Sequence, residues 1–405
     1  MANVSSSNGI EKYPKLRFPE FTEQWKKIKI GDIYAERSER GSETSELLSV
    51  TMNDGVKRRS ELEGKDNSSE DKGNYKVVCT GDMVYNSMRM WQGANGISPY
   101  NGIVSPAYTV LTAKCDISNG FFAALFKTHK LVSEFCKHSQ GMTSDTWNLK
   151  YPQIETIKTY IPSVAEQQKI AALIEKVDKR IAIQKELIDS LKKYKRGAFE
   201  CVFSQKIKLT NCNTPWKKFK LSDFATRITR KNGEQTDIPL TISAQYGLID
   251  QRNFFTKTVA STDMSGYYLL KSGEFAYNRS TSNDYPFGSI KRLEKYEKGA
   301  VSTLYICFEI NKEIMNSDFI TLFYESTKWH KQISEICAEG ARNHGLLNVP
   351  TNGFFDCVFD LPSDLDEQEK IARFLNGIQD KLDNENRILD QLQLFKKALL
   401  QSMFI

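Results

Sequence analysis

One short motif occurs twice in this chain of 405 residues. The segment EQQKIA covers residues 166–171, and EQEKIA covers residues 367–372. Other segments correspond in the same order at a shift of about 190 to 201 residues. Because ordered self-similarity indicates duplicated structural units, the sequence predicts two related halves. The further pairs are QWKKIKIGDI (24–33) with PWKKFKLSDF (215–224), GDMVYN (81–86) with GEFAYN (273–278), GIVSPAY (102–108) with GAVSTLY (299–305), and WNL (147–149) with LNV (347–349).

Each copy of the motif opens a segment that is predicted to form a long helix. Ser163 and Ser363 occupy N-cap positions, and Glu166 and Asp366 follow three residues later, at capping-box spacing. No proline interrupts either segment, so each helix would extend about 60 Å at 1.5 Å per residue. The apolar stripe comprises Ile170, Ile174, Val177, Ile181, Ile188, Leu191, Ala198 and Val202 in the first copy, and Ile371, Leu375, Ile378, Leu382, Leu389, Leu392, Leu399 and Met403 in the second.

The repeated three- and four-residue spacing favours a coiled-coil pair over the alternative of two ordinary core helices. The first helix must carry the chain from one globular unit to the next, so we expect the units at opposite ends and the second helix running back antiparallel. Both stripes are interrupted at matching positions, by Gln184 and Glu385 and by Lys195 and Lys396. We expect Gln184 and Glu385 to form a polar layer that determines the register. The alternative is that both face solvent at a kink.

The rest of each half predicts a mixed α+β domain. Alternating stretches at 76–86 and 267–278 are typical of strands, and the segments at 120–138 and 317–340 are typical of amphipathic helices. The predicted parts are a first mixed domain at 1–162, a helix at 163–204, a second mixed domain at 205–362 and a helix at 363–405. Outside the shared segments the two domains differ strongly in sequence, as expected for two related domains that recognise different targets.

Composition restricts the environment of the protein more than its activity. The N-terminus has no apolar signal segment, and the longest apolar run, FFAALF (121–126), is far too short to span a membrane, so a cytoplasmic protein is expected. The eight cysteines include no C-x-x-C pair, and structural thiols explain them better than a zinc site. A formal charge of +6, from 56 basic and 50 acidic residues, is compatible with a polyanionic partner without requiring one.

Signatures of the common enzyme classes are missing from the sequence. It contains no G-x-x-x-x-G-K-[ST] phosphate loop, no G-x-S-x-G elbow and no H-E-x-x-H zinc motif. The dipeptide YN at 85–86 and 277–278 lacks the prolines and final aromatic residue of an amino-methyltransferase motif, and we interpret it as a strand end. We therefore expect no catalytic residues and no metal or cofactor site in this chain.

Several predicted loops combine cations with amide and aromatic side chains. Such mixtures suit phosphate contacts and readout of base edges, in which arginine pairs with guanine and asparagine or glutamine with adenine. A solvated loop explains any single cluster better, and only the repeated architecture favours a role in DNA binding for the set. The candidate residues are Lys57, Arg58, Arg59, Arg89, Trp91, Gln92, Arg227, Arg230, Lys231, Arg279, Asn283, Arg342, Asn343 and His344.

Over nearly its full length the chain resembles the specificity (S) subunit of type I restriction-modification systems. The resemblance rests on the openings at Trp25 and Trp216, the GD and GE turns before YN, and the paired helices that begin at EQ.KIA and end in KRGAF (195–199) and KKALL (396–400). It implies two target recognition domains that each read half of a split DNA site, separated by antiparallel helices that act as a spacer.

The resemblance also implies partners that perform the chemistry. Two methylation subunits would bind S-adenosylmethionine and methylate adenine by base flipping, and two restriction subunits would use ATP and Mg for translocation and cleavage. A free-standing tandem DNA-binding regulator is the second interpretation, and a coiled-coil scaffold without a nucleic-acid role is the third. The first predicts a stable complex with an adenine methyltransferase, whereas the second predicts tight selective DNA binding by the chain alone.

Overall fold

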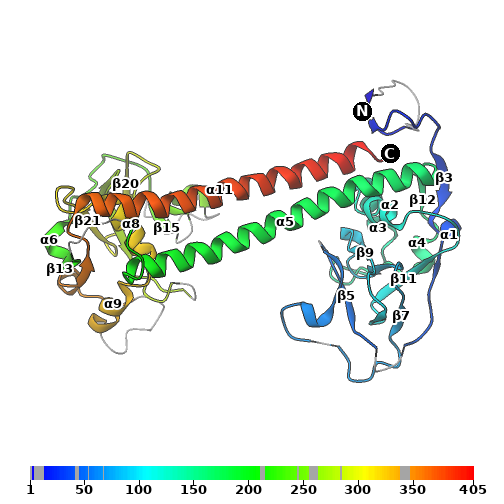
Figure 1. Ribbon diagram of the computed structural model, residues 1–405, viewed down its shortest axis with the longest axis horizontal. Coiled ribbons are helices and arrows are strands. Elements are labelled where there is room, and N and C mark those ends of the chain that lie inside the picture. The colour runs from blue at the N-terminus through cyan, green and yellow to red at the C-terminus, as the bar shows by residue number, and fades with distance from the viewer. Residues whose placement is uncertain are drawn as a thin grey trace. The chain divides into compact units, whose positions relative to one another are not determined.

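The computed structural model describes residues 2–3, 13–41, 45–52, 54–66, 68–209, 215–243, 246–254, 263–282, 285–337 and 347–405. The chain forms two compact units, of which unit 1 contains Met1–Leu187 with Glu385–Ile405 and unit 2 contains Ile188–Asn384. The boundaries fall inside two long helices, α5 (Val164–Phe203) and α11 (Leu365–Ser402) (Figure 1). Each unit therefore combines a globular part with a piece of both helices.

Unit 1 is organised by a four-stranded antiparallel sheet of order β4-β11-β8-β9. Alternate residues of β8 face two different cores: Met83 and Tyr85 pack in the larger one, and Val84 packs in the smaller one. Because both faces of this strand are covered, its first three residues are all hydrophobic. The elements are β1 (Ala2–Asn3), β2 (Leu16–Arg17), β3 (Lys26–Lys29), α1 (Ile30–Ile33), β4 (Tyr34–Glu36), β5 (Leu48–Thr51), β6 (Gly55–Arg58), η1 (Arg59–Glu61), β7 (Lys76–Val78), β8 (Met83–Asn86), η2 (Met90–Gln92), β9 (Asn95–Ile97), β10 (Gly102–Val104), β11 (Tyr108–Ala113), α2 (Asn119–Leu125), α3 (His129–His138), α4 (Tyr151–Ile154) and β12 (Lys158–Ile161).

Unit 2 repeats this plan element by element. Its central sheet has the order β14-β21-β18-β19, and Phe275 and Tyr277 of β18 face the larger core, whereas Ala276 faces the smaller one. In both units the strand after the opening tryptophan pairs with the last strand before the long helix, as β3 with β12 and β13 with β22. The elements are β13 (Lys217–Lys220), α6 (Leu221–Phe224), β14 (Ala225–Ile228), β15 (Leu240–Ser243), β16 (Gly247–Asp250), α7 (Gln251–Phe254), β17 (Tyr268–Lys271), β18 (Phe275–Asn278), β19 (Ser289–Arg292), β20 (Lys298–Val301), β21 (Ile306–Ile310), α8 (Ser317–Glu325), α9 (His330–Ile336), α10 (Thr351–Phe355) and β22 (Val358–Leu361).

The predicted mixed α+β class with two long antiparallel helices is confirmed. Each segment predicted as an amphipathic helix forms two helices, α2 and α3 in unit 1 and α8 and α9 in unit 2. The break in unit 1 lies at Thr128, whose side chain caps α3 by accepting a bond from the amide of Leu131 and donates to the carbonyl of Leu125. The YN dipeptides end β8 and β18, as predicted.

Both long helices contribute to the core of each unit. In unit 1, Ile170 of α5 and Leu399 of α11 belong to one apolar cluster, and in unit 2 the cluster contains Phe203 of α5 and Leu375 of α11. Full burial of an aliphatic side chain of this size stabilises by about 1.5–3 kcal/mol. Of the sixteen stripe residues, four are half-buried, Ile181, Leu191, Leu389 and Leu392. The other twelve are buried: Ile170, Ile174, Val177, Ile188, Ala198, Val202, Ile371, Leu375, Ile378, Leu382, Leu399 and Met403.

Polar contacts between α5 and α11 occur at the positions that interrupt the apolar stripes. The Gln184 amide nitrogen donates to a carboxylate oxygen of Glu385 at 2.6 Å and to the Glu385 carbonyl at 3.0 Å, so the predicted polar layer is present and the solvent-facing kink is not. In unit 2, Lys195 Nζ donates to Gln379 at 2.6 Å, and in unit 1, Lys396 lies 2.5 Å from Asp178. These last two contacts are equivalent in the repeat. At a shift of 201 residues Lys195 corresponds to Lys396 and Asp178 corresponds to Gln379, so the same lysine position binds the same partner position in each unit.

The predicted caps of the two long helices need one correction. Ser163 caps α5, with its hydroxyl 3.5 Å from the Glu166 amide. Ser363 does not cap α11, because the helix begins at Leu365 and the Asp364 carboxylate accepts from the Asp366 amide at 2.9 Å. The segment SDLDEQ is one residue longer than SVAEQ, so Asp364 takes the place that Ser163 has in the first copy. Asx side chains cap as well as serine, which explains the shift.

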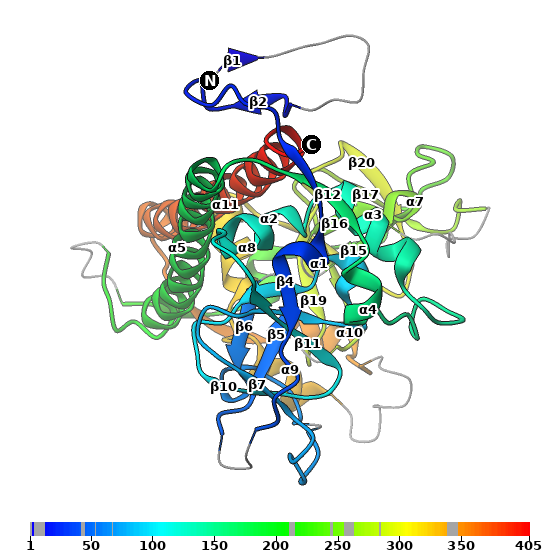
Figure 2. The same ribbon diagram turned by 90° about the vertical axis from the view of Figure 1, so that its right-hand side faces the viewer.

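The glutamine of each EQ.KIA motif joins the start of a long helix to the globular part of its unit. Gln167 accepts from the amide of Ser118 at 3.1 Å, and Gln368 accepts from the amide of Asn316 at 2.6 Å. Ser118 and Asn316 are the residues before α2 and α8, and each glutamine also donates to the carbonyl of the proline before its own helix. Ala171 faces Gly120, which lets α2 approach α5 closely (Figures 1 and 2). The doubled motif is therefore a structural joint.

Candidate nucleic-acid interface

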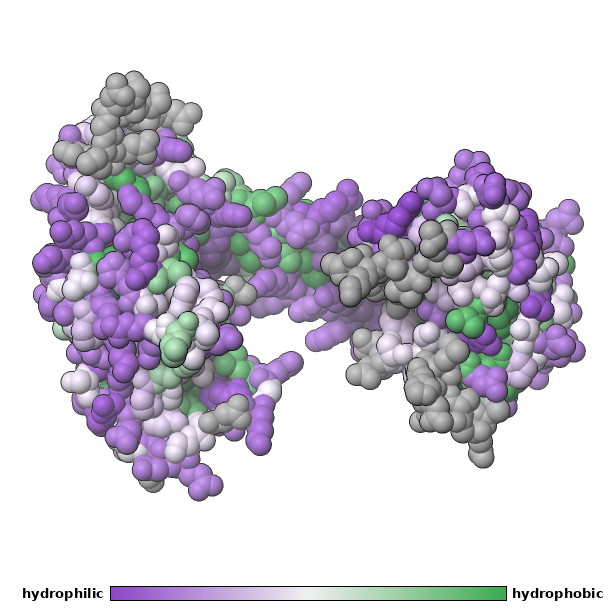
Figure 3. All heavy atoms as spheres, turned by 180° about the vertical axis from the view of Figure 1, so that it is seen from behind, coloured by the Kyte–Doolittle hydropathy of each residue, from purple (hydrophilic) through white to green (hydrophobic). Residues whose placement is uncertain are grey.

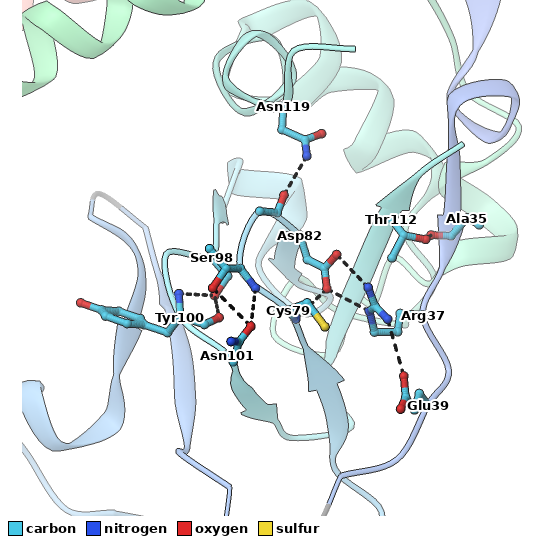
Figure 4. Close-up of polar contacts among 12 residues, drawn as sticks. Ala35, Arg37, Glu39, Cys79, Asp82, Ser98, Tyr100, Asn101, Thr112 and Asn119 are labelled. Carbon is cyan, nitrogen blue, oxygen red and sulfur yellow. Dashed lines mark hydrogen bonds and ion pairs between the residues drawn. The ribbon is translucent and has the colours of Figure 1, made fainter. Parts of the chain in front are cut away.

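The GD and GE turns hold an arginine in each unit. In unit 1, Asp82 accepts two bonds from the Arg37 guanidinium, at 2.9 and 3.2 Å, and one from the Cys79 amide at 2.8 Å (Figure 4). In unit 2, Glu274 accepts from Arg230 at 2.6 and 2.8 Å and from the Lys271 amide at 2.7 Å. Asp82 and Glu274 therefore each close their own turn. Each also binds an arginine that follows the first strand of its sheet, Arg37 after β4 and Arg230 after β14. The hydrogen bond to the Asp82 carboxylate raises the pKa of Arg37.

The asparagines of the two YN dipeptides form matching turns. Asn86 accepts from the Met88 amide, and Asn278 accepts from the Ser280 amide, both at 3.0 Å. The preceding tyrosines are fully buried, and burial raises the pKa of Tyr85 and Tyr277 well above the ordinary range. These dipeptides support the strand ends from which the next loops emerge, at Arg89 in unit 1 and Arg279 in unit 2.

Three of the candidate arginines are already hydrogen-bonded within the protein, Arg59 to its own loop and Arg230 and Arg279 to segments distant in sequence. Arg59 donates to the carbonyls of Leu62, Gly64 and Lys65 at 2.8–3.0 Å. Arg230 is bound to Glu274, and Arg279 donates to the carbonyls of Val349 at 3.1 Å and Leu304 at 2.8 Å. A guanidinium already engaged in this way has fewer free donors for a base edge. These side chains therefore hold segments of their own units together.

Four other candidates have polar side chains without a hydrogen-bond or ion-pair partner among the described residues. Within the described residues, the side chains of Lys57, Arg89, Gln92 and Arg227 make no hydrogen bond or ion pair. Gln92 and Arg227 are exposed, and Lys57 and Arg89 are half-buried. Arg89, Trp91 and Gln92 are brought together by the short η2 turn. Their donors are available to a ligand.

Two further cations lie over aromatic rings. The Arg58 guanidinium is 4.5 Å from the centre of the Tyr100 ring, and Lys231 Nζ is 4.6 Å from that of Tyr268. Lys231 also donates to the Gly266 carbonyl at 2.9 Å. Asn283, Arg342, Asn343 and His344 lie outside the described residues.

A hollow on unit 1 brings the candidate Trp91 together with six residues that were not candidates. Its volume is about 510 Å³, and it is lined by Trp91, His129, Val132, Ser133, Cys136, Lys137 and Trp147. Five of these residues lie on one face of α3, at helical spacings of three and four. The signal in the sequence was the polar face of this amphipathic helix together with a tryptophan in the shared WNL segment.

The long helices expose apolar side chains beyond those that pack. On α5, Ile183, Leu187 and Tyr194 are 55%, 39% and 56% exposed, and on α11, Leu394 and Phe395 are 66% and 52% exposed. Figure 3 shows hydrophobic residues along the helices on one face, whereas the globular parts on that face are mostly hydrophilic. Exposed apolar residues that follow one helix face are typical of a surface that binds another protein.

Metal-ion binding and thiol reactivity depend on how the His, Cys, Asp and Glu side chains of the described residues are placed. Among them, no group of three or more His, Cys, Asp or Glu side chains is arranged to hold a metal ion. The seven described cysteines are free thiols, and burial raises the pKa of Cys307 to about 12 and that of Cys357 to about 11. Such thiols stay protonated and unreactive at neutral pH. No helix in the described part of the chain has the length and apolarity needed to cross a bilayer.

Comparisons with known proteins agree with this architecture. Residues 22–193 match the model of the type I restriction modification DNA specificity domain. The fold is similar to the crystal structure of the type I restriction-modification system S subunit from M. genitalium, with 15% identity, a TM-score of 0.58, and coverage of 97% of this chain and 99% of that one. It is also similar to a chain from a structure on complex assembly and conformational transition of the type I R-M system, with 13% identity, a TM-score of 0.57, and coverage of 94% and 97%. The resemblance inferred from the sequence is confirmed: residues 22–193 belong to the type I restriction modification DNA specificity domain family, and the whole chain has the fold of a type I S subunit.

Proposed function

We propose that this chain is the DNA specificity subunit of a type I restriction-modification complex. Residues 1–162 and 205–362 form two target recognition domains, and each reads one half of an asymmetric bipartite site. The helices at 163–204 and 363–405 set the length of the spacer between the half-sites. The observation that carries the proposal is one α+β frame that occurs twice, with the same joints and different loops.

The difference between the loops supports recognition of two unlike half-sites. Both units keep the arginine of the acidic turn, the strand-end asparagine and the glutamine joint. The residues that follow the strand end differ, with Arg89, Trp91 and Gln92 in unit 1 and Arg279 with its carbonyl contacts in unit 2. A shared frame with unlike contact residues supplies the same docking geometry and separate sequence preferences.

The side chains with free donors are the ones we assign to DNA. Arg89, Gln92 and Arg227 suit base edges, because arginine and glutamine make paired hydrogen bonds to guanine and adenine. Lys57 suits a phosphate, a contact that contributes affinity and its dependence on salt without contributing sequence preference. Each paired contact to a base contributes about 1–3 kcal/mol of discrimination.

Catalysis in this proposal belongs to partner subunits. Methylation subunits bind the exposed apolar residues of the long helices, Ile183, Leu187 and Tyr194 of α5 and Leu394 and Phe395 of α11. They supply S-adenosylmethionine and flip the target adenine out of the duplex. Restriction subunits join this complex for ATP-driven translocation and cleavage.

The test is a map of modified bases in host DNA, recorded by single-molecule sequencing with and without this gene. The neighbouring methyltransferase gene stays intact in both strains. Loss of adenine methylation at one asymmetric split motif is the expected result, and it identifies the target together with the role. An unchanged map, with the protein shown to be expressed, contradicts the proposal and favours a free-standing DNA-binding regulator.

A further inference from the structure

The hollow on α3 has two tryptophans as one wall. The rings of Trp91 and Trp147 lie 5.3 Å apart at an angle of 79°, and both side chains are half-buried. The opposite face of α3 is buried in the core through Leu131 and Phe135, so the helix itself is anchored. Edge-to-face pairing of two indoles leaves ring surface open toward the hollow.

The tryptophan from η2 is held rigidly. Trp91 donates its indole N–H to the Met88 carbonyl at 3.0 Å, which fixes the ring and leaves its π-face for a ligand. Gly93, at φ +84°, ends the η2 turn where a side chain would meet the Phe126 carbonyl and Val132 at 3.4 Å. This close approach brings η2 onto α3.

The second tryptophan is carried by a closed loop. Gln140 and Asn148 exchange two backbone hydrogen bonds, at 3.0 and 2.8 Å, across the base of the loop. Gly141 has φ +148°, and a Cβ there would lie 2.6 Å from the Thr146 carbonyl. The residue after the loop, Leu149, is fully buried. Trp147 is therefore presented by a preorganised segment.

Helix α3 lines the rest of the hollow with apolar side chains, Val132 and Cys136, and with three polar ones. Ser133, His129 and Lys137 lie on the exposed face of α3, and Lys137 Nζ is 2.7 Å from a Glu134 oxygen while its side chain stays 66% exposed. The lining therefore combines aromatic and apolar surface with a hydroxyl, an imidazole and an ammonium group, which suits a ligand that has both a flat apolar part and a polar part. Such a lining suits a planar heterocycle that carries an anionic group, and a hollow of this volume accommodates a nucleotide.

We propose that the hollow lined by Trp91, Trp147, His129, Ser133 and Lys137 binds one unpaired nucleotide of a DNA strand. The base stacks on the indoles, and the phosphate binds at Lys137 and His129. The nucleotide is unpaired because the faces of a base inside a duplex are covered by its neighbours. Only the source of that nucleotide rests on the proposed function: base flipping by a methylation subunit leaves bases locally unstacked.

The experiment uses the full chain and a fluorescein-labelled single-stranded oligothymidylate, with binding measured by fluorescence anisotropy. Trp91→Ala and Trp147→Ala are each expected to weaken binding about 5- to 150-fold, the range for loss of one stacked base. Trp91→Phe and Trp147→Phe retain a ring and should restore most of the affinity. Met142→Ala is the matched control, because Met142 is 99% exposed on the same loop and does not line the hollow.

Three results overturn the proposal. The first is an unchanged Kd for both alanine variants when their thermal unfolding matches that of the parent chain. The second is equal binding of an abasic oligonucleotide of the same length, which would reduce the interaction to phosphate contacts. Competition by AMP as strong as that of the oligonucleotide would assign a free nucleotide and overturn the assignment to a DNA strand. Oligonucleotide binding is measured on the chain alone, so its failure is distinct from failure of the methylation map.

Discussion

Glu166 and Glu367 are equivalent residues of the repeat with different partners. Arg17 binds both oxygens of Glu166, at 2.8 and 2.7 Å, and both side chains are buried. Trp216 donates to one oxygen of Glu367 at 3.2 Å, and within the described residues the other oxygen is buried without a hydrogen bond. Lys208 occupies the place of Arg17, eight residues before the tryptophan, and lines a cavity of about 40 Å³ beside Glu367. Both carboxylate oxygens of Glu166 are therefore hydrogen-bonded, whereas only one of the two oxygens of Glu367 is.

Replacing Arg17 should destabilise unit 1 strongly. Arg17→Ala leaves the Glu166 carboxylate buried and uncompensated, which costs about 3–5 kcal/mol. Lys208→Ala is the matched control, because Lys208 is exposed and such surface changes stay within about 0.5 kcal/mol. Calorimetric unfolding of both variants measures the difference. Equal effects of the two changes would show that the buried pair does not stabilise the joint.

Neighbouring arginines of RITRK should have separate roles. Arg227→Ala should leave thermal unfolding unchanged and reduce discrimination at one base of the second half-site by about 1–3 kcal/mol. Arg230→Ala should instead lower the stability by about 1–3 kcal/mol, because it removes the partner of Glu274. Unfolding curves and methylation of half-site variants separate the two effects. A loss of discrimination in the Arg230 variant with normal stability would reverse these assignments.

At the scale of elements, the repeat made the helices, the strand ends and the duplicated domains predictable from sequence. Those features depend on local signals such as apolar spacing and turn residues. The candidate site was less predictable, because the partners of its arginines are distant in sequence. Arg230 binds Glu274, and Arg279 binds the carbonyl of Val349, 70 residues away. A single sequence does not encode such pairings in any local pattern.

The polar layer between α5 and α11 should determine their register. Replacing Gln184 and Glu385 together with leucine removes the bonds at 2.6 and 3.0 Å and leaves an apolar seam that permits sliding. We expect a more stable pair with mixed registers, measured by disulfide trapping of cysteine pairs placed along the two helices. Lys185→Leu, at the neighbouring exposed position, is the control. A single register in the double variant would assign this role to Lys195 and Lys396.

At the scale of the whole molecule, the proposed function treats the two globular parts as separable readers. Exchanging residues 20–160 for another domain of this kind should change one half of the methylated motif and leave the other half and the spacer unchanged. The glutamine joint at Gln167 stays in place in this exchange, so the incoming domain must present the amide that Ser118 supplies and pack against Ile170 and Ile174 of α5. Methylation mapping gives the result directly. A change in both halves would contradict independent readout.

The spacer role of the helices is testable at the boundary between the units. One heptad inserted after Leu187 and another after Asn384 leaves the contacts within each unit intact, including those of Gln184 and Lys195. A heptad adds about 10 Å of helix, which corresponds to about three base pairs of duplex. The methylated motif should therefore keep both half-sites and gain a longer spacer.

The control inserts the heptad into α5 alone, which mismatches the apolar stripes of the two helices and should abolish methylation. If the double insertion kept the original spacer, the helices would not measure the distance between half-sites, and DNA bending would have to set it. If the spacer lengthened but one half-site changed, the long helices would also orient the reading loops. Only a longer spacer between unchanged half-sites agrees with helices that set the spacer length without affecting base recognition by the two domains.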